Sequence, residues 1–468
     1  MNDIKFGTDG WRAIIAKEFT VENVARISHA TAQWLVANFE KPTMILGHDC
    51  RFAGQLFSEV TAKVMTESGV KVFLAKGAVS TPMISLACVK MEMSIGVVLT
   101  ASHNPPSYHG FKLKGGFGGP LFPDDVNAVE ALIPDANAID LDAISLDDLI
   151  EAGKVEIVDL ESMYFDHCKA NFDLDLIANS DIGFSYDAMY GAGQDIMRRL
   201  LPDISFLHCD HNPSFMGQAP EPIYKNLVEF SEKIAKDDGI NSGLATDGDA
   251  DRLGMFNSSG EFIDSHHLIL LLIHYLCKYK GMTGKVCTAF STTVKIKKMC
   301  EHYGLELDVV KIGFKHICEI MVKEDVLVGG EESGGIAIKG HIPERDGIWI
   351  GLTLWEFMVK SGKSMDELIQ EVYEITGTFA FERSDLHIKE EEKLAIIEKC
   401  KAGGYDSFGD RKVEYMDDLD GFKYFFNENE WFMIRPSGTE PVLRTYAEAA
   451  SRDEALDILK VGYTTLFN

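Results

Sequence analysis

Short apolar runs alternate with helical patterns over the first 150 residues, and this alternation limits the folds open to the chain more than any other feature. Residues 44–47 and 70–74 have the pattern of buried strands, and residues 56–68 between them have the pattern of a helix. Strands and helices that alternate in this way are typical of a parallel sheet with crossover helices. Residues 1–150 are therefore predicted to form an α/β domain.

The rest of the chain divides into three further units. Residues 151–255 and 256–377 contain more strand and helix patterns, and each range is expected to form a unit of its own. Residues 378–468 differ, because the strand-like runs 412–415, 423–426 and 430–434 are joined by short turns, which favours antiparallel pairing. The last helix is expected to begin after Ser451, where Glu454 completes a capping box.

Length, charge and cysteine content exclude several classes of protein. A chain of 468 residues is expected to form several domains. Nine scattered cysteines without a C-x-x-C pair favour the reduced thiols of a cytoplasmic protein over a disulfide frame or a zinc site. A net charge of −28 disfavours nucleic acid and anionic membranes as partners, and no apolar run is long enough to span a membrane. Anionic substrates must then be bound by local basic pockets.

A serine follows the apolar run 95–99, which is predicted to be a buried strand. The sequence continues Thr-Ala-Ser-His-Asn, and two prolines at 105 and 106 end any regular structure. Ser102 therefore lies at the carboxyl end of a strand, where open α/β sheets bind ligands. His103, Lys112 and Lys114 lie close by in sequence and can move protons or hold phosphate. The alternative is a turn serine that bonds its own backbone.

Three carboxylates, Asp247, Asp249 and Asp251, follow the predicted strand 242–245 at alternate positions. Alternate residues of an extended loop point the same way, and oxygen ligands suit Mg²⁺, especially where a phosphate supplies a further oxygen. A solvated acidic turn and a calcium loop are the alternatives. An EF-hand would need glutamate at its twelfth position, which here is Ser258. The pattern therefore favours magnesium.

Two more loops carry polar groups that suit a sugar phosphate. The glycine-rich segment 329–335 follows a predicted strand, and Glu331 and Ser333 in it can bond sugar hydroxyls. The segment 435–441 reads Arg-Pro-Ser-Gly-Thr-Glu-Pro, and with Arg444 it offers hydroxyls, free N–H groups and two guanidinium groups to a phosphate. A flexible loop and a polar hairpin turn are the respective alternatives.

Taken together, these motifs resemble those of the α-D-phosphohexomutase family. The active-serine loop, the Asp-Gly-Asp-Ala-Asp-Arg loop at 247–252, the sugar loop and the phosphate loop occur in the family's order, and weaker similarity is present at 6–12 and 313–316. The resemblance therefore covers essentially the whole chain. It implies four domains around a central cleft: three α/β domains with mixed, mainly parallel sheets, and a C-terminal α+β domain with an antiparallel sheet.

The resemblance also implies an activity and a set of site residues. A phosphoryl group on Ser102 would pass to a hexose monophosphate, and the 1,6-bisphosphate would turn over and return its other phosphate. Glucose 1,6-bisphosphate would thus be intermediate and activator, and one Mg²⁺ would lie in each active site. The implied catalytic residues are Ser102, His103, Lys112, Arg12 and Arg252, with Lys112 or His103 as general base. The implied metal ligands are Ser102, Asp247, Asp249 and Asp251. The implied substrate-binding residues are Lys315, Glu331, Ser333, Arg435, Ser437, Gly438, Thr439 and Arg444.

The preferred sugar depends on the middle residue of Glu-Glu-Ser in the sugar loop. Glu332 resembles the phosphoglucomutase branch, so glucose phosphate is the expected substrate. Mannose phosphate or glucosamine phosphate, in the same family, is the alternative. A catalytically silent sugar-phosphate sensor would require loss of the serine or of a metal ligand, and all are present. The expected partners are small sugar phosphates, and the expected state is a monomer or a homodimer.

Overall fold

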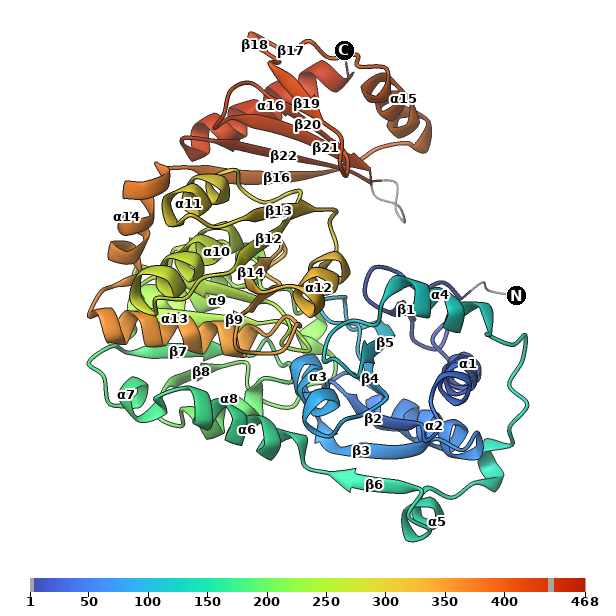
Figure 1. The fold of residues 1–468 in the computed structure, drawn as a ribbon. Coiled ribbons are helices and arrows are strands. Elements are labelled where there is room, and N and C mark those ends of the chain that lie inside the picture. The colour runs from blue at the N-terminus through green and yellow to red at the C-terminus, as the bar shows by residue number, and fades with distance from the viewer. Residues whose placement is uncertain (1–3, 437–441, 468) are drawn as a thin grey trace.

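The computed structural model describes residues 4–436 and 442–467 and contains three α/β units followed by a fourth built on an antiparallel sheet (Figure 1). The fold class predicted from the sequence is therefore confirmed. No helix within the described ranges is both long enough and apolar enough to cross a membrane.

The first unit is a six-stranded sheet in which the serine strand is central. The order is β1 (Trp11–Ile14), β5 (Tyr108–Gly115), β4 (Ile95–Leu99), β2 (Thr43–His48), β3 (Lys71–Ala78) and β6 (Val155–Val158). The last four run parallel, whereas β1 and β5 are antiparallel to their neighbours. The helices of this unit are α1 (Val21–Asn38), α2 (Gly54–Glu67), α3 (Thr81–Lys90), α4 (Pro123–Ala131), η1 (Leu141–Ala143) and α5 (Leu146–Glu151). Every residue of β4 is buried, as its apolar sequence predicts.

The second unit contains the strand that leads into the acidic loop. Its sheet order is β11 (Phe262–Ile263), β10 (Leu253–Phe256), β9 (Ser242–Thr246), β7 (Phe184–Asp187) and β8 (Ser205–Leu207). The helices are α6 (Leu160–Asn171), α7 (Leu174–Ala178), α8 (Gln194–Leu200), η2 (Phe215–Gly217), η3 (Tyr224–Asn226) and α9 (Val228–Lys236).

The third unit carries the sugar loop between two adjacent strands. Its sheet order is β13 (Leu307–Val310), β12 (Lys285–Ala289), β14 (Val326–Gly330) and β15 (Ile336–Ile338), with β15 antiparallel to β14. The helices are α10 (Ser265–His274) with its π-helical continuation η4 (Tyr275–Tyr279), α11 (Lys295–Tyr303), α12 (Phe314–Lys323), α13 (Gly347–Ser361) and α14 (Met365–Thr376).

The fourth unit is an antiparallel sheet, as the short turns predicted. Its order is β16 (Ala380–His387), β22 (Val442–Ala449), β21 (Trp431–Pro436), β20 (Phe422–Phe425) and β19 (Tyr415–Asp417). Helices α15 (Glu390–Lys401) and α16 (Arg452–Phe467) and the small pair β17 (Ser407–Phe408) and β18 (Arg411–Lys412) complete it. The run expected as one strand at 412–415 is divided between β18 and β19. At the start of α16, Ser451 Oγ accepts a hydrogen bond from Glu454 N at 3.4 Å.

Two sheets continue past the domain limits expected from the sequence. Strand β6 pairs with β3 in the first sheet, although it follows residue 150. Strands β10 and β11 belong to the second sheet, although they extend past residue 255. We propose that the first domain continues to Val158 and the second to Ile263, since a strand belongs with the sheet that it pairs with.

Three apolar clusters explain how the units are joined. One continuous cluster contains buried residues of the first three units and ends at Phe379, at the very start of the fourth. The fourth unit has a cluster of its own and contacts the third through a smaller one formed by Phe290, Phe425, Trp431, Met433 and Tyr446. The loops that follow β4, β9 and β14 are therefore held by a shared core, whereas the phosphate loop belongs to a unit with a separate one.

Candidate active site

Ser102 lies in a strained loop and contacts the acidic loop of the second unit. The residue is buried and has a φ of +52°, a left-handed conformation that residues other than glycine rarely adopt. Its Oγ donates a hydrogen bond of 2.6 Å to Asp247 Oδ2. His103 Nδ1 lies 3.3 Å from Ser102 Oγ. The side chain of Ser102 is thus held against the carboxylate that the sequence associated with a metal.

The three carboxylates after β9 form a compact buried cluster. Asp247, Asp249 and Asp251 are fully buried and offer oxygens that all lie within 4.8 Å of one another. Burial, together with the charges of the other two carboxylates, raises the pKa of Asp247 well above its usual value. Oδ1 of Asp249 and Oδ1 of Asp251 have no hydrogen-bond partner in the described structure. Buried oxygens that lack a hydrogen-bond partner fit a hard divalent cation.

Lys112 places its amino group among these carboxylates. Its Nζ lies 2.8 Å from Asp249 Oδ2, 2.9 Å from Asp251 Oδ2 and 2.8 Å from Asp9 Oδ2. Burial alone would lower the pKa of Lys112, but Asp249, Asp251 and Asp9 hold this pKa above its usual value. The side chain is therefore a fixed cation at the edge of the carboxylate cluster.

The interpretation of the sequence assigned no role to Asp9, Glu344 or Arg345, which extend this network of charges. Arg345 Nη2 contacts Asp9 Oδ2 at 2.5 Å and Asp251 Oδ2 at 2.9 Å, and its Nε lies 3.2 Å from Glu344 Oε1. Lys114, a candidate phosphate ligand from sequence, is paired instead with Glu344 at 2.6 Å. Asp9 lies in the segment 6–12 that showed family similarity, whereas Glu344 and Arg345 carried no comparable signal.

Arg12 and Arg252 lie close to the serine loop without a hydrogen bond to Ser102 among the described contacts. Arg12 Nη1 donates to Asn104 Oδ1 at 2.7 Å, so it contacts the serine loop two residues beyond Ser102. The backbone N of Arg252 donates to Asp247 Oδ1 at 3.1 Å. Burial, with Arg252, Arg12, Lys112 and Arg51 as further causes, lowers the pKa of His103 well below its usual value. Positive charge therefore surrounds the serine loop.

The sugar loop lies between β14 and β15, and its two key residues differ in environment. Glu331 is buried, and its Oε1 accepts a hydrogen bond of 2.9 Å from Gly313 N. Burial raises the pKa of Glu331, while Arg345 and Arg252 oppose this shift. Ser333 is partly exposed at the turn of the loop.

Glu332 contacts the fourth unit. Arg383 Nη1 of β16 donates to Glu332 Oε1 at 3.1 Å, and Ser265 Oγ donates to the Glu332 carbonyl at 2.5 Å. The residue on which the sugar assignment depends therefore links the sugar loop to β16.

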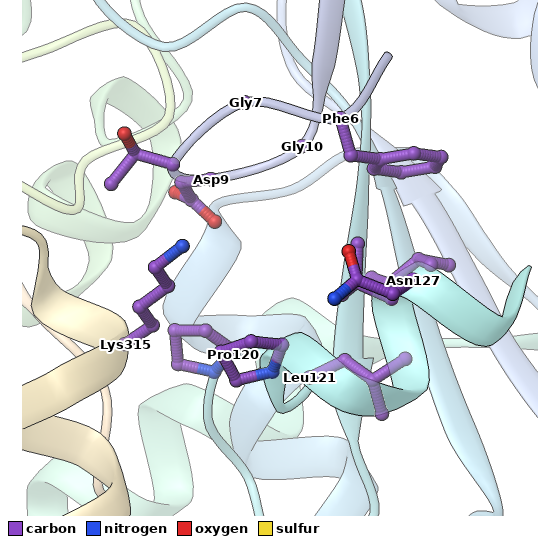
Figure 2. Close-up of a pocket in the computed structure, with 12 residues that line it drawn as sticks. Phe6, Gly7, Asp9, Gly10, Pro120, Leu121, Asn127 and Lys315 are labelled. Carbon is purple, nitrogen blue, oxygen red and sulfur yellow. The ribbon is translucent and has the colours of Figure 1, made fainter. Parts of the chain in front are cut away.

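Lys315 lies near the start of α12 and lines a cavity of about 70 Å³ between the first and third units. Figure 2 shows its amino group pointing toward the carboxylate of Asp9, with Pro120 and Leu121 nearby. Because Asp9 also contacts Lys112, the cavity adjoins the charge network.

Arg435 and Arg444 lie directly opposite each other on β21 and β22. Like charges in this position are unfavourable unless an anion lies near them. Arg435 contacts Asp420 at 3.3 Å, and Arg444 Nε has no hydrogen-bond partner in the described structure. Ser437, Gly438 and Thr439, expected to complete this phosphate site, lie outside the described residues.

A serine hydroxyl held against buried carboxylates and surrounded by cations is the arrangement expected of a metal-assisted phosphoryl-transfer enzyme. Models of domains I, II, III and the C-terminal domain of phosphoglucomutase/phosphomannomutase match residues 3–139, 162–260, 264–375 and 386–460. The chain belongs to the phosphoglucomutase/phosphomannomutase family, and it is accordingly an intramolecular phosphotransferase.

Individual relatives match over nearly the whole chain. A phosphoglucomutase/phosphomannomutase of Thermococcus kodakarensis is 28% identical over 466 residues, which cover 98% of each chain. A phosphoglucosamine mutase of Methanococcus maripaludis is 29% identical over 437 residues, which cover 91% of each chain. The crystal structure of a Thermus thermophilus protein described as a phosphomannomutase has a TM-score of 0.87 at 32% identity, covering 100% of this chain and 99% of that one.

Proposed function

We propose that the protein interconverts hexose 1-phosphates and hexose 6-phosphates through a phosphoserine at Ser102 and a hexose 1,6-bisphosphate. The observation that carries this proposal is the hydrogen bond of 2.6 Å from the buried Ser102 Oγ to Asp247 in the carboxylate cluster. In the first step the phosphoryl group leaves Ser102 Oγ for a free hydroxyl of the monophosphate, and that hydroxyl loses its proton to a base. After the bisphosphate turns over, Ser102 Oγ accepts the other phosphoryl group.

Ser102, Asp247, Asp249 and Asp251 would hold Mg²⁺. The Oδ1 atoms of Asp249 and Asp251 support this assignment, since each is buried without a hydrogen-bond partner in the described structure, and Arg252 Nε lies as far as 4.0 Å from Asp251 Oδ1. When bound there, Mg²⁺ offsets negative charge on the transferring phosphoryl group. A cation at this place would also relieve the repulsion among the three buried carboxylates, whose oxygens lie within 4.8 Å of one another.

We favour His103 over Lys112 as the general base. Lys112 Nζ is held by three carboxylates at 2.8–2.9 Å, whereas His103 Nδ1 lies 3.3 Å from the serine oxygen. An imidazole at this place can take the proton from the sugar hydroxyl, and Lys112 can serve as the fixed cation beside the transferred group.

The opposite end of the substrate would be held by the third and fourth units. Glu331 and Ser333 offer acceptors to the sugar hydroxyls, and Lys315 offers an amino group to a phosphate. Arg435 and Arg444, with Ser437, Gly438 and Thr439, would hold the phosphate that does not react. When the bisphosphate turns over, its two phosphates would exchange places between this site and Ser102, which is the reorientation that the reaction needs.

We propose glucose phosphate as the preferred substrate, on the basis of Glu332 in the sequence Glu-Glu-Ser. The alternatives are mannose phosphate and glucosamine phosphate, since similar proteins carry the names phosphoglucomutase/phosphomannomutase and phosphoglucosamine mutase. Hydrogen bonds from Glu331 and Ser333 to O3 and O4 would not distinguish sugars that differ at C2. Mannose phosphate is therefore expected to react as well, only more slowly.

A direct test compares kcat/KM for the 1-phosphates of glucose, mannose and glucosamine at one concentration of glucose 1,6-bisphosphate. Formation of the 6-phosphates is measured by coupled assays. We expect glucose 1-phosphate to give the highest value and glucosamine 1-phosphate the lowest. A highest value for glucosamine 1-phosphate would overturn the sugar assignment and leave the phosphoserine proposal standing. No turnover of any of the three would instead favour a sugar-phosphate sensor.

A further inference from the structure

The side chain of Arg51 holds the serine loop by hydrogen bonds to the backbone of that loop. The residue follows β2, and its side chain is completely buried. Its guanidinium donates to four carbonyl oxygens of the loop: those of Ser102 and Asn104 from Nη2, the latter at 2.7 Å, and those of Pro105 and Tyr108 from Nη1, at 3.0 and 3.3 Å. One side chain thus fixes a segment that extends on both sides of the two prolines.

Asp49 holds the same loop through Thr100, whose hydroxyl bonds the backbone N–H of Ser102. Its Oδ2 lies 3.2 Å from Arg51 Nε and accepts a hydrogen bond of 2.5 Å from Thr100 Oγ1. Thr100 Oγ1 in turn accepts a hydrogen bond of 2.8 Å from Ser102 N. Arg51 and Asp49 therefore control both the amide and the carbonyl of Ser102. Charged groups in a buried network of this kind are strongly held, since water cannot replace either partner.

The backbone of Ser102 needs such support because its φ of +52° is unfavourable for serine. A residue keeps this conformation only where its surroundings determine it. The Ser102 carbonyl oxygen also lies very close to Gly248 of the acidic loop. A Cβ added to Gly248 would lie 2.6 Å from this oxygen. A small movement of the carbonyl would therefore move Ser102 Oγ away from Asp247, its partner at 2.6 Å.

Phe215 of the second unit covers the guanidinium of Arg51. The ring centroid lies 4.8 Å from the central carbon of the guanidinium, and Phe215 is buried. A cation on an aromatic face is attracted more strongly where both are shielded from water. Phe215 and Met216 have φ values of +46° and +52°, so the backbone that carries the Phe215 ring is itself strained. Its conformation is consistent with a fixed position over Arg51.

We propose that Arg51 is a positioning residue for phosphoryl transfer at Ser102, and that Asp49 and Phe215 hold Arg51 in place. This inference rests on the proposed phosphoserine function. Arg51 bonds the backbone of the serine loop, whereas Lys315, Arg435 and Arg444 are the groups assigned to the substrate. Loss of the N–H donors of the Arg51 guanidinium therefore lowers kcat. KM stays nearly unchanged, because ground-state binding of the sugar phosphate does not depend on Arg51.

The test uses Arg51→Lys, with Arg26→Lys as the matched control. Lysine keeps a positive charge beside Asp49, but it cannot form the planar fork that reaches four carbonyl oxygens. Arg26 is also buried in the first unit and bonds a backbone oxygen, that of Pro134, away from the serine loop. For Arg51→Lys we expect kcat to fall by about 100-fold, and KM to stay within about twofold. Arg26→Lys is expected to keep both constants near those of the wild type.

Hydrogen exchange gives a readout that does not depend on activity. Amides of residues 100–108 are expected to exchange faster in Arg51→Lys than in the wild type, and at the wild-type rate in Arg26→Lys. Phe215→Leu keeps an apolar side chain over Arg51 but removes the ring, and it serves as a milder variant should Arg51→Lys fail to fold. We expect it to change kcat and exchange in the same direction by a smaller factor.

Three results overturn the inference. The first is a near wild-type kcat in Arg51→Lys or, should that variant not fold, in Phe215→Leu. The second is an equal loss of kcat in Arg26→Lys, and the third is unchanged exchange of residues 100–108. Absence of mutase activity in the wild-type protein would count against the proposed function instead. The exchange experiment would then decide alone whether Arg51 holds the loop.

Discussion

Replacing Lys112 by methionine tests how much the buried charges at the active site depend on one another. The amino group of Lys112 lies 2.8 Å from Asp9 and from Asp249 and 2.9 Å from Asp251, and its side chain is completely buried. Methionine has a similar length but no charge, so Lys112→Met removes the ion pairs while largely preserving the packing.

The partners that remain determine the size of the effect. Asp9 and Asp251 each keep a contact with Arg345. Asp249 keeps the hydroxyl of Thr81 at 2.5 Å, and no other cation contacts it among the described residues. One buried carboxylate is thus left without a countercharge, which costs about 3–5 kcal/mol of the free energy of unfolding.

Magnesium should reduce this cost, because the cation supplies positive charge to Asp249 in place of the lost amino group. The assay is urea unfolding of the wild type and of Lys112→Met, each in EDTA and in excess MgCl₂. The control is Lys71→Met, which breaks an exposed ion pair of 3.1 Å with Glu156 and should cost about 0–1 kcal/mol. A loss below about 1 kcal/mol for Lys112→Met in EDTA would refute the reasoning, since that is the cost of an exposed pair. An equal loss with and without Mg²⁺ would refute the link to the metal.

Three further outcomes follow from the site and from the contact between the third and fourth units. Ser102→Ala should lower mutase activity by several orders of magnitude with an unchanged circular dichroism spectrum, and near-normal turnover would end the phosphoserine proposal. Activity should vanish in EDTA and return with Mg²⁺; activity that survives thorough chelation and dialysis would exclude the assignment to Asp247, Asp249 and Asp251. Glu448 on β22 accepts a hydrogen bond of 2.9 Å from Thr293 Oγ1 of the third unit, and burial, only partly offset by Lys423, raises the pKa of Glu448 to about 7. Its contribution to stability is therefore present below its ordinary pKa of 4.5 and is lost as the pH rises to about 7. Glu448→Gln should flatten this part of the stability profile measured by urea unfolding, and an unchanged profile would contradict the raised pKa.

The strands that precede the active loops could be located from sequence because their residues are buried on both faces. Residues 95–99 and 242–245 are continuous apolar or small runs that end in polar or glycine-rich loops, and both became central strands. The same signal is weak where a strand lies at an edge. Val155–Val158 is a short segment, Val-Glu-Ile-Val, that joins the first sheet only by pairing with β3, which no local pattern reveals.

Residues that act through tertiary contacts could not be identified in the same way. Arg51 is separated by 51 positions from Ser102, and Asp9 by 336 from Arg345. An arginine that bonds backbone carbonyls has the same local sequence appearance as one exposed to solvent. Glu332 illustrates the converse, because its sequence context suggested sugar recognition, whereas its carboxylate contacts Arg383 of the fourth unit. Position 332 can therefore influence the sugar through the placement of β16 as well as by direct contact.

The distribution of charge explains how a chain with a net charge of −28 can bind phosphates. Surface carboxylates more than about 8 Å from a ligand are largely screened at physiological salt. Burial lowers the pKa of His103, and the nearby charges of Arg252, Arg12, Lys112 and Arg51 lower it further. Charges in such a buried environment interact more strongly than charges in water. A phosphate at the serine loop is therefore governed by this local cluster, while the acidic exterior disfavours polyanions too large to enter it.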